Sequence, residues 1–392
     1  MKAVTLIIGL ILLILLEVLR VYFIMPFPGS QSANTIGIAY WLHNNILWLR
    51  LIGWAIIAYP LFYFLRQPSS WKRYALLLGL VLYAVVGYLF NFRFLADKMF
   101  YQPKQKMFAT GDKNSIKGEK LVIGVSINGE AKAYPIQLIG YHHQVRDTVG
   151  GIPVMVTYCT VCRTGRVFSP DVKGKTEDFR LVGMDHFNAM FEDASTKSWW
   201  QQATGMAIAG PLKGTSLKEI PSQQVRLDRW LEAYPTSLVM QPDDNFKEDY
   251  AHLDKYDKGQ GKSDLTRRDT SSWQFKSWVV GISTPSAAKA YDWNRLIREK
   301  VVNDSLPGLA TVLLMETDSA SFHAWDRKID SLYLRFQPAG TNQMSDTQTG
   351  SVWNADGKCV DGFLKGKQLA RIQAYQEFWH SWQTFHPHSG KY

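Results

Sequence analysis

The hydrophobic positions divide the chain into two parts. Three apolar stretches fill most of residues 1–95, from Ala3 to about Met25, from about Ile46 to Leu65 and from about Tyr74 to Phe92. A helix that crosses a bilayer needs roughly 20 apolar residues, so each stretch is long enough, or nearly so, to span a membrane. Tryptophan and tyrosine residues near the ends of the stretches are typical of membrane interfaces. We therefore predict a transmembrane region with three helices over residues 1–95.

Two charged residues complicate the first predicted helix. Glu17 and Arg20 are three positions apart on one helix face, where they could pair. Because charges are costly in hydrocarbon, we expect instead that both lie near the membrane edge and extend toward water. The same stretch could be a cleaved signal peptide, but its apolar run is longer than a typical signal core and no small-residue cleavage pattern follows. We expect a retained helix.

Basic residues indicate the orientation of the predicted spans. The segment from Pro26 to Asn45 contains no Lys or Arg, whereas the loop after the second span carries Arg66, Lys72 and Arg73. Cytoplasmic loops carry an excess of basic residues, so this loop is predicted to be cytoplasmic. Basic residues after the third span oppose the assignment, but large domains cross membranes largely regardless of charge. We expect the large C-terminal region outside the cytoplasm.

The rest of the chain contains an internal repeat in sequence. Segments with similar residues recur in the same order, and such recurrence is typical of duplicated structural units. The matching segments are 122–126 with 279–283, 131–134 with 288–291, and 210–237 with 362–389. We predict two tandem related modules, 102–240 and 273–392, separated by a polar linker or surface excursion over 241–272.

Each module is predicted to be mostly β with one helix near its end. Residues 122–128 and 131–136 are strand-like and flank Asn128-Gly129, which is a strong hairpin signal. In the second module, aromatic residues recur at helical intervals from Tyr375 to Phe385. The predicted fold class is an N-terminal three-helix membrane region followed by a β-rich α+β region built from two tandem related modules.

A cysteine pair is the leading candidate for function. Cys159 and Cys162 are two of only three cysteines in the chain. In the alignment of the two modules they correspond to Glu316 and Ser319. A module that folds again without the pair does not need it in order to fold. The third cysteine, Cys359, is expected to be buried and inert.

A predicted hairpin brings a histidine to the cysteines. Gly150 and Gly151 form a favoured two-residue turn. Counting outward from that turn pairs the two strands residue by residue and sets His142 opposite Cys159, and directly opposed residues have Cβ atoms about 4.5 to 5.5 Å apart. His142 aligns with Glu299 in the second module. The histidine and the cysteines are therefore lost together, which indicates one site.

Three functions fit a cysteine pair beside a histidine. The main prediction is that Cys159, Cys162 and His142 bind Zn²⁺ or copper, with Asp147 orienting the histidine or acting as a base. The fourth ligand would be His143, Asp185, His186 or a water. The first alternative is thiol–disulfide redox chemistry. The second is a static disulfide in a structural or interaction protein.

A second polar group follows in the first module. Asn188, Asp193 and Gln201 surround a tryptophan pair, and pockets for small molecules combine aromatic walls with a few polar groups. With Asp147, these three are the candidate catalytic residues. Alternatively, Asp193 only begins a turn and Trp200 lies in the core, which we expect because the second module roughly keeps this segment.

The motifs around the cysteines form a specific set. His142-x-x-Val145-x-Asp147 is followed by the run GGIPVMVTYCTVC over residues 150–162, and further blocks lie within 188–205 and 353–382. This set resembles the bacterial domain of unknown function 3179 family over essentially the whole soluble region. The chain departs from the family pattern at three places, namely His143 where Glu is frequent, Arg146 where Asn is frequent, and Thr160-Val161 where Pro-Leu is frequent.

The resemblance implies a bacterial envelope protein but no reaction. With the predicted spans, it places the chain in the bacterial inner membrane, with the C-terminal region facing the periplasm or exterior. The net charge of +10 comes partly from membrane-flanking residues, and no basic stripe with interleaved aromatics occurs. We therefore expect no nucleic-acid partner. The expected partners are the membrane and a small-molecule ligand or metal ion, and the sequence leaves open whether the protein is an enzyme.

Overall fold

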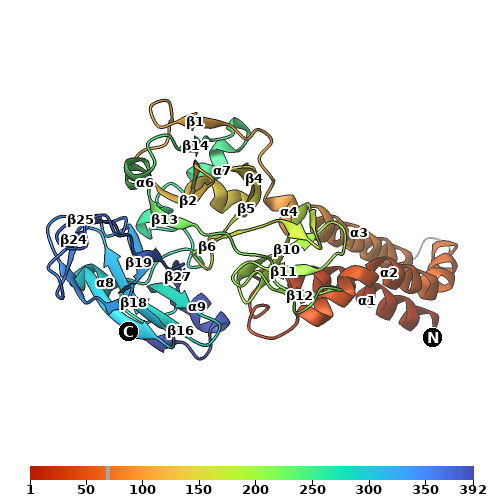
Figure 1. Cartoon of the computed structure of the whole chain (residues 1–392). Helices are drawn as coiled ribbons and strands as arrows, with labels where there is room; N and C mark the ends of the chain where they lie inside the picture. The colour runs from red at the N-terminus through yellow and green to blue at the C-terminus, as the bar shows by residue number, and fades with distance from the viewer. Residues whose placement is uncertain (68–70) are drawn as a thin grey trace. The chain divides into compact units, whose positions relative to one another are not determined.

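The computed structural model describes residues 1–67 and 71–392 (Figure 1). These residues form two compact units. The first unit contains residues 1–101, 177–201 and 206–216, and the second contains residues 102–176, 202–205 and 217–392. The chain therefore passes back and forth between the units within the predicted first module.

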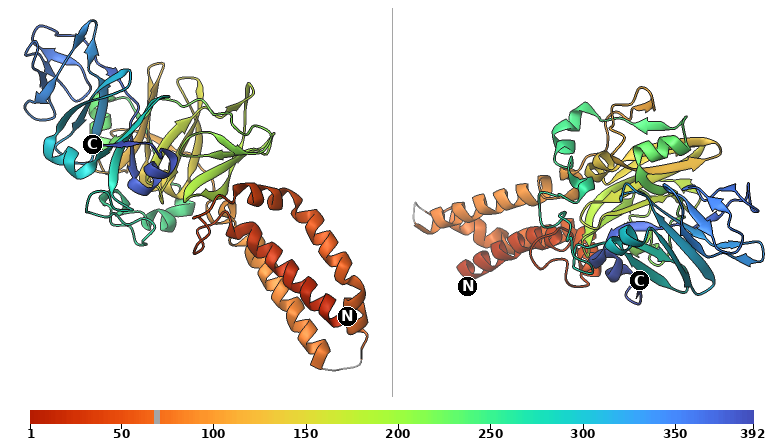
Figure 2. Two further views of the ribbon diagram at one scale, coloured as in Figure 1. Left: turned by 90° about the horizontal axis from the view of Figure 1, so that it is seen from below. Right: turned by 90° about the vertical axis from the view of Figure 1, so that its left-hand side faces the viewer.

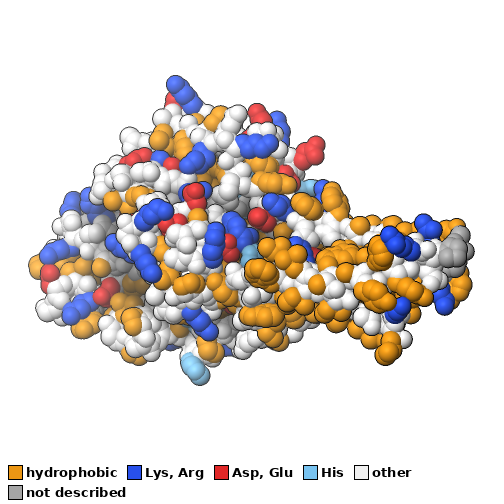
Figure 3. Space-filling model, turned by 90° about the vertical axis from the view of Figure 1, so that its right-hand side faces the viewer, with side chains coloured by type: hydrophobic (Ala, Val, Ile, Leu, Met, Phe, Trp, Pro, Cys, Tyr) orange, Lys and Arg blue, Asp and Glu red, His pale blue; other side chains and the backbone are white. Residues whose placement is uncertain are grey.

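Three long helices form the N-terminal part of the first unit. They are α1 (Lys2–Tyr22), α2 (Ile36–Leu65) and α3 (Trp71–Phe92), and each is long and apolar enough to cross a membrane. They lie side by side in both views of Figure 2, with Leu13 of α1 and Ile57 of α2 in their common core. Apolar side chains also gather on the outer surface of this bundle (Figure 3), as expected of helices that face lipid. The prediction of three candidate spans is confirmed.

The second of these helices is longer than predicted. It begins at Ile36, not near Ile46. The residues from Ile38 to Asn45 include no proline or glycine, so nothing in them stops a helix. His43, Asn44 and Asn45 made this part too polar to count as a span.

The first unit also contains a short helix and an antiparallel sheet. The helix α4 (Ala96–Met99) follows the three long helices. The sheet has the strand order β12-β11-β10-β9, with β9 (Phe179–Asp185), β10 (Asn188–Asp193), β11 (Trp199–Gln201) and β12 (Ala207–Ala209). The turn between β9 and β10 is formed by His186 and Phe187, which both have positive φ, 47° and 68°.

The N-terminal half of the second unit contains two main sheets. The first has the order β1-β14-β3-β2-β13, with β1 (Phe108–Thr110), β2 (Leu121–Ile127), β3 (Glu130–Pro135), β13 (Gln223–Arg226) and β14 (Leu238–Met240). The second has the order β4-β5-β6, with β4 (Gln144–Val149), β5 (Ile152–Cys159) and β6 (Thr164–Phe168). A small hairpin joins β7 (Asp171–Val172) and β8 (Lys175–Thr176). The helices here are α5 (Ile136–His142) and α6 (Leu227–Ala233).

The C-terminal half has its own sheets. Their orders are β27-β15-β16-β28, β17-β18-β19-β26, β22-β23-β24-β25 and β20-β21. The strands are β15 (Trp278–Ser283), β16 (Ala288–Asp292), β17 (Val301–Leu306), β18 (Leu309–Met315), β19 (Phe322–Asp326), β20 (Lys328–Ile329), β21 (Leu332–Tyr333), β22 (Phe336–Pro338), β23 (Met344–Asp346), β24 (Val352–Trp353), β25 (Cys359–Asp361), β26 (Ala370–Arg371), β27 (Tyr375–Phe378) and β28 (Gly390–Lys391). The helices are α8 (Trp293–Glu299) and α9 (Trp379–Phe385).

Strand pairing follows one scheme in the two halves. The central hairpin β2–β3 pairs antiparallel with β13 on one side and parallel with β14 on the other. The hairpin β15–β16 pairs antiparallel with β27 and parallel with β28. In each half, one face of this sheet packs on a helix tryptophan, Trp230 of α6 or Trp382 of α9. The packing is close, since a Cβ on Gly124 would meet Trp230 and a Cβ on Gly281 would meet Trp382.

Both predicted hairpin turns are confirmed. The turn between β2 and β3 is formed by Asn128 and Gly129, with φ of 49° and 84°. Strands β4 and β5 meet in the counted register, from Val149 opposite Ile152 to Gln144 opposite Thr157. Gly150 is required at its turn, because its φ is 54° and a Cβ there would lie 2.2 Å from the carbonyl oxygen of Ile127.

Two segments differ from the prediction. The aromatic run from Tyr375 to Phe385 is a strand followed by a helix, since β27 ends at Phe378 and α9 begins at Trp379. The polar segment 241–272 contains η1 (Asp244–Phe246), α7 (Lys247–Ala251) and η2 (Tyr256–Lys258). Phe246, Tyr250 and Tyr256 in this segment are buried. Burial of these three aromatic side chains holds the otherwise charged segment against the core of the second unit.

Candidate functional site

The cysteine pair lies in the turn between β5 and β6. Cys159 is the last residue of β5, and Cys162 lies within the turn. Arg163 closes the turn with a left-handed φ of 56°. Both cysteine side chains are 0% exposed, and the structure holds them as thiols rather than as a disulfide.

The two thiol groups interact with each other. Burial, followed by a hydrogen bond with Cys159, raises the pKa of the Cys162 thiol well above its ordinary value. Burial also lowers the pKa of the nearby Lys276 ammonium to about 8, although Cys162 and Cys159 oppose that shift. The thiolate is the nucleophile and the metal ligand. The buried turn therefore favours the less reactive, protonated form of Cys162.

Residues far along the chain cover the turn. Lys276 Nζ donates to the carbonyl oxygen of Val161 at 2.6 Å, and His380 Nε2 lies 3.2 Å from the same oxygen. The backbone N–H of Phe378 donates to the carbonyl oxygen of Cys162 at 2.9 Å. The cover thus comes from β27, α9 and the segment before β15. The sequence-based prediction confined the site to the first module and missed these residues, because their contacts are purely tertiary.

Arg163 fastens the turn to the cover. Its guanidinium is fully buried and donates to Gln376 Oε1 at 2.9 Å and to the carbonyl oxygen of Tyr256 at 3.2 Å. It also lies 3.9 Å from the centre of the Trp278 ring, a cation–π contact. The hydroxyl of Tyr256 donates to the carbonyl oxygen of Thr160 at 2.9 Å. The aromatic residues of segment 241–272 are therefore part of the site.

A buried ion pair stands beside the turn. Arg166 of β6 contacts Glu377 of β27 at 3.2 Å and Glu219 at 3.5 Å. Burial raises the pKa of Glu377, and Arg166 opposes that rise. Ser381 donates to the second oxygen of Glu377 at 2.9 Å, and its side chain also contacts the Cys162 thiol. Ser381 thus links the ion pair to the cysteines.

The predicted position of His142 is wrong. The β4–β5 ladder ends at the pair Gln144–Thr157, and His142 is the last residue of α5. His143 then takes a left-handed φ of 61°, which separates helix from strand. The helix replaces the strand that the count assumed, so His142 does not stand opposite Cys159 in the ladder. Its Nε2 lies 2.6 Å from the hydroxyl of Tyr250.

Asp147 belongs to a polar group on β3 and β4. It accepts hydrogen bonds from the Tyr134 hydroxyl at 2.8 Å and from Lys132 Nζ at 3.1 Å. Burial is the main cause that raises the pKa of Tyr134 well above its ordinary value, and the negative charge of Asp147 is the second. In the C-terminal half, Lys289 lies 2.6 Å from Asp304 in the same way. These contacts hold the strands together, and the predicted role of Asp147 in orienting His142 stays a prediction.

The residues predicted to bind metal are not gathered into one cluster. Within residues 1–67 and 71–392, no group of three or more His, Cys, Asp or Glu side chains is arranged to hold a metal ion. Of the residues considered as a fourth ligand, His143 contacts the carbonyl oxygen of Tyr141 at 3.0 Å. Asp185 and His186 lie in the first unit and contact each other at 2.6 Å. Metal binding stays a prediction.

Asp193 fixes a turn in the first unit. It accepts hydrogen bonds from Thr196, Ser198 and Trp200, including 2.9 Å from the indole Nε1. Burial acts to raise its pKa, but these bonds outweigh burial and lower it. Asp346 accepts from Thr349 and from the Trp353 indole at 3.0 Å in the C-terminal half. The same arrangement occurs twice, which favours the turn-and-core interpretation for Asp193.

The other two predicted residues also lie in the first unit. Asn188 is fully buried at the start of β10, where it pairs with Asp185 of β9. Gln201 Nε2 donates to Asp185 Oδ2 at 2.6 Å. The hydrogen bond that Asp185 accepts from His186 Nδ1 raises the pKa of His186. The structure thus brings Asn188 and Gln201 together around Asp185, and their catalytic role stays a prediction.

A polar cluster joins the three long helices. Glu17 is 1% exposed and accepts from Arg50 of α2 at 2.6 Å and from Asn91 of α3 at 2.9 Å. Arg20 donates to Asn91 Oδ1 at 2.6 Å. The expectation that Glu17 and Arg20 extend to water is wrong, because both side chains are buried and hydrogen-bonded to residues of the other helices.

Fold and site together define a class: a β-rich protein with three candidate membrane spans and a buried cysteine pair. A family model described as "Protein of unknown function (DUF3179)" matches residues 102–389. The chain belongs to this family. Searches of the curated proteins and of the solved structures found no match.

Proposed function

We propose that this protein is a membrane-anchored, extracytoplasmic thiol–disulfide protein whose working pair is Cys159 and Cys162. The observation that carries the proposal is that both cysteines lie, three positions apart and fully buried, at the one turn that follows β5. Cysteines three positions apart form the C-x-x-C arrangement, which in other proteins cycles between thiol and disulfide. The neighbouring Lys276 supplies positive charge that favours the transient thiolate.

The reaction is an exchange with the disulfide of a partner protein or small molecule. The S–H bonds of Cys159 and Cys162 break and an S–S bond forms between them. The partner disulfide takes up the two electrons and two protons and leaves as two thiols. Both cysteines are 0% exposed, so the exchange requires the cover over the turn to open.

The proposed location rests on the three apolar helices and on the charge pattern around them. The helices are suited to membrane anchoring. The basic residues Arg66, Lys72 and Arg73 after α2 favour a cytoplasmic loop there. With three spans, the second unit would face the periplasm or exterior of a bacterium. That compartment is oxidising, which permits disulfides to form.

We further propose that the β-rich region arose by internal duplication. The common strand pairing scheme and the repeated Asp193 and Asp346 turns support it. The strongest support is a contact between two residues that the alignment makes equivalent, since Gln224 Nε2 donates to Gln376 Oε1. Equivalent residues meet each other at the two-fold axis of an isologous interface. The two halves would therefore be related as the subunits of a symmetric dimer.

Thiol counting and metal analysis on the full-length protein in detergent test the redox proposal. Purified under air, the protein is expected to show one accessible thiol after denaturation, that of Cys359, and three after reduction. Metal should be well below one equivalent. The Cys159→Ser, Cys162→Ser double variant should show one thiol in both conditions. The matched control Cys359→Ser should show none before reduction and two after.

Other outcomes decide between the alternatives. One equivalent of zinc or copper that the double variant lacks would overturn the redox proposal in favour of the metal site. Three thiols after prolonged exposure to oxidised glutathione would identify the cysteines as inert packing residues. A disulfide that resists reduction in the folded protein would indicate a static structural bridge.

A further inference from the structure

Glu377 places a buried carboxylate where the aligned strand has an apolar residue. It is 1% exposed in β27, opposite Val279 of β15. The aligned residue of β13 is Val225, which is 2% exposed and lies opposite Val122 of β2. Replacing a buried ion pair by apolar residues is often neutral or stabilising. The strand scheme therefore does not need a carboxylate at this position, and Glu377 is available for another role.

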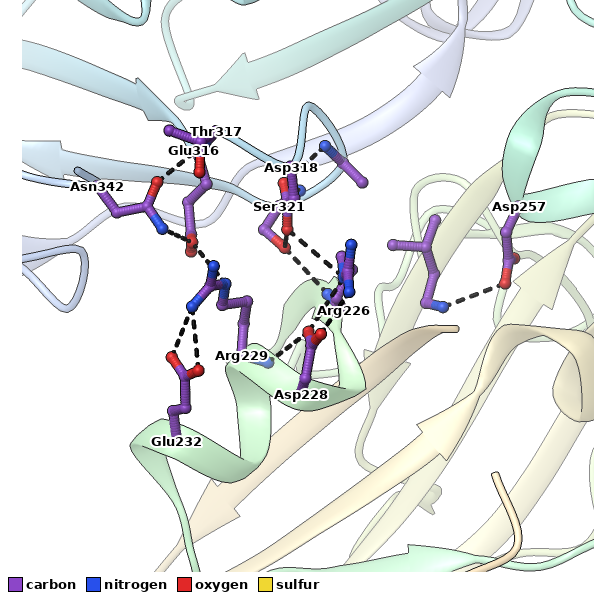
Figure 4. Close-up of polar contacts among 12 residues, drawn as sticks. Arg226, Asp228, Arg229, Glu232, Asp257, Glu316, Thr317, Asp318, Ser321 and Asn342 are labelled. Atoms are coloured by element: carbon purple, nitrogen blue, oxygen red, sulfur yellow. Dashed lines mark hydrogen bonds and ion pairs between the residues drawn. The ribbon is translucent and has the colours of Figure 1, made fainter. Parts of the chain in front are cut away.

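The residues that face the two aligned turns differ together. Ser381 of α9, which donates to Glu377, aligns with Arg229 of α6. Figure 4 shows Arg229 reaching Glu316, the residue that aligns with the first cysteine, and the two side chains lie 3.2 Å apart. His323 contacts Glu316 at 2.7 Å, and a cavity of about 310 Å³ opens there. The turn without cysteines thus faces neither a carboxylate nor a hydroxyl at these two positions.

Arg166 keeps a partner when Glu377 takes up a proton. The Arg166 guanidinium contacts Glu377 at 3.2 Å and Glu219 at 3.5 Å. It also lies 3.2 Å from the centre of the Tyr375 ring. Neutralising Glu377 would therefore not leave a buried guanidinium alone. Burial raises the pKa of Glu377, although Arg166 opposes the rise, and a carboxylate with a raised pKa is suited to accept protons.

Two other basic groups near the cysteine turn are already engaged. Lys276 Nζ donates to the carbonyl oxygens of Val161 and Leu265, at 2.6 and 2.7 Å, and lies 3.1 Å from His380 Nε2. These contacts use the three hydrogens of the ammonium, which has no lone pair to offer. Burial, followed by the charge of Lys276, lowers the pKa of His380 to about 3. Neither group is thus suited to take a proton from a thiol at neutral pH.

We propose that Glu377, acting through Ser381, accepts the proton of Cys162 during thiol–disulfide exchange. Ser381 Oγ donates to Glu377 Oε2 at 2.9 Å, and the Ser381 side chain contacts the Cys162 thiol. The backbone N–H of Phe378 donates to the carbonyl oxygen of Cys162 at 2.9 Å and so holds β27 against the turn. The inference rests on the redox function proposed above and names the proton acceptor of that site.

The relay acts in the second step of the exchange. In the first step, Cys159 forms a mixed disulfide with one sulfur of the partner. The Cys162 proton then passes to Ser381 Oγ while the Ser381 proton passes to Glu377. The Cys162 sulfur attacks that of Cys159, and the bond to the partner breaks with its electron pair on the partner's sulfur. Glu377 returns its proton to water, and the departing thiolate takes one up from water, so the exchange balances.

The test follows oxidation of the reduced, full-length protein in detergent by oxidised glutathione. Acid quenching and mass spectrometry separate the mixed glutathione adduct of the first step from the disulfide of the second. In wild type the adduct should not accumulate, and the second step should level off above the pKa of Glu377. In Glu377→Gln this step should slow about a hundredfold at neutral pH, so that the adduct accumulates. Its rate should rise about tenfold per pH unit, because Cys162 must then lose its proton to water.

A second variant separates the relay from the ion pair. Ser381→Ala keeps Glu377 and Arg166 in contact, and it should slow the same step with the same change in pH profile. The matched control is Glu192→Gln in the first unit, which neutralises a buried carboxylate that contacts Arg180 at 2.9 Å. The control should leave both steps unchanged.

The outcomes distinguish the relay from the redox function. A wild type that forms no disulfide between the two cysteines would overturn both. A wild type that forms it, while Glu377→Gln and Ser381→Ala resolve the adduct at the same rate and with the same pH profile, would overturn the relay alone. Equal slowing by Glu192→Gln would also overturn the relay. Thermal unfolding shows which variants fold, and if Glu377→Gln does not, Ser381→Ala decides.

Discussion

The cysteine turn and the Glu316 turn follow corresponding strands, yet their surroundings are opposite. Cys159 and Cys162 lie under a cover in which Lys276, Phe378 and His380 engage the turn. Glu316 lies at a cavity, where Arg229 and Asn342 reach it from the rim and wall. Under the proposed duplication, the same strand scheme ends in two turns with different surroundings. A covered turn protects thiols, whereas an open turn presents a fixed carboxylate and imidazole.

The difference follows from the helix that faces each turn. At the cysteine turn, α9 contributes the small Ser381, which approaches the Cys162 thiol closely. The aligned residue of α6 is Arg229, whose long side chain bridges Glu316 and Glu232 and keeps the elements apart. The small Ser381 allows α9 to pack closely on the cysteine turn. The Arg229 guanidinium, which contacts two carboxylates, needs more room between α6 and the Glu316 turn.

The largest expected effect comes from breaking the buried ion pair on the covered side. Glu377→Ala leaves Arg166 without its most buried partner. Removing one member of a buried pair costs about 3 kcal/mol or more, and Glu219 reduces this loss only in part. Glu316→Ala should cost about 1 to 2 kcal/mol, because its partner Arg229 is 30% exposed and keeps Glu232 as a second carboxylate. Denaturant unfolding in detergent measures both, and equal losses would refute the contrast.

Replacing Gln376 should destabilise the protein more than replacing Gln224, although the two side chains contact each other. Gln376 Oε1 accepts from both Gln224 and the buried Arg163. Gln376→Leu should therefore cost about 2 kcal/mol, and Gln224→Leu about 1 kcal/mol. The reverse order, measured by the same unfolding experiment, would show that Arg163 does not depend on this acceptor.

Cys162 should make stability depend on alkaline pH. Its folded pKa lies well above the ordinary thiol value of 9.0. Its contribution is therefore fully present below about pH 9 and is lost as pH rises through the folded pKa. The stability difference between reduced wild type and Cys162→Ala should shrink between pH 8 and 10.5 or so. Comparing the two proteins cancels the titration of groups that Cys162 does not influence. Lys276 is not one of these groups, because Cys162 acts to raise its pKa. A constant difference would contradict the raised pKa.

The smallest effect is expected at the cavity rim. The Glu232 side chain is 65% exposed, although it contacts Arg229 at 2.8 Å. Exposed ion pairs contribute at most about 1 kcal/mol. Glu232→Ala should thus change the thermal midpoint hardly at all. A large loss would mean that Arg229, and with it the open cavity, depends on this rim contact.

The sequence predicted the parts of the fold that depend on local pattern. Apolar length predicted the three helices, and Gly150 and Gly151 predicted the β4–β5 register, which the structure confirms. His142 was misplaced because a short helix of buried residues has no distinctive period. The cover over the cysteines was missed because Lys276 and Ser381 are over a hundred positions away and carry no motif. Contacts of that kind depend on how the two halves pack.

The most direct test of the redox proposal is an anaerobic redox titration of the full-length protein in glutathione buffers. Differential alkylation and mass spectrometry would follow each cysteine. Cys159 and Cys162 should oxidise together, in one two-electron transition, while Cys359 stays a thiol that is modified only after unfolding. Independent oxidation of the two cysteines, mixed glutathione adducts without a disulfide between them, or no oxidation at any potential would contradict the proposal.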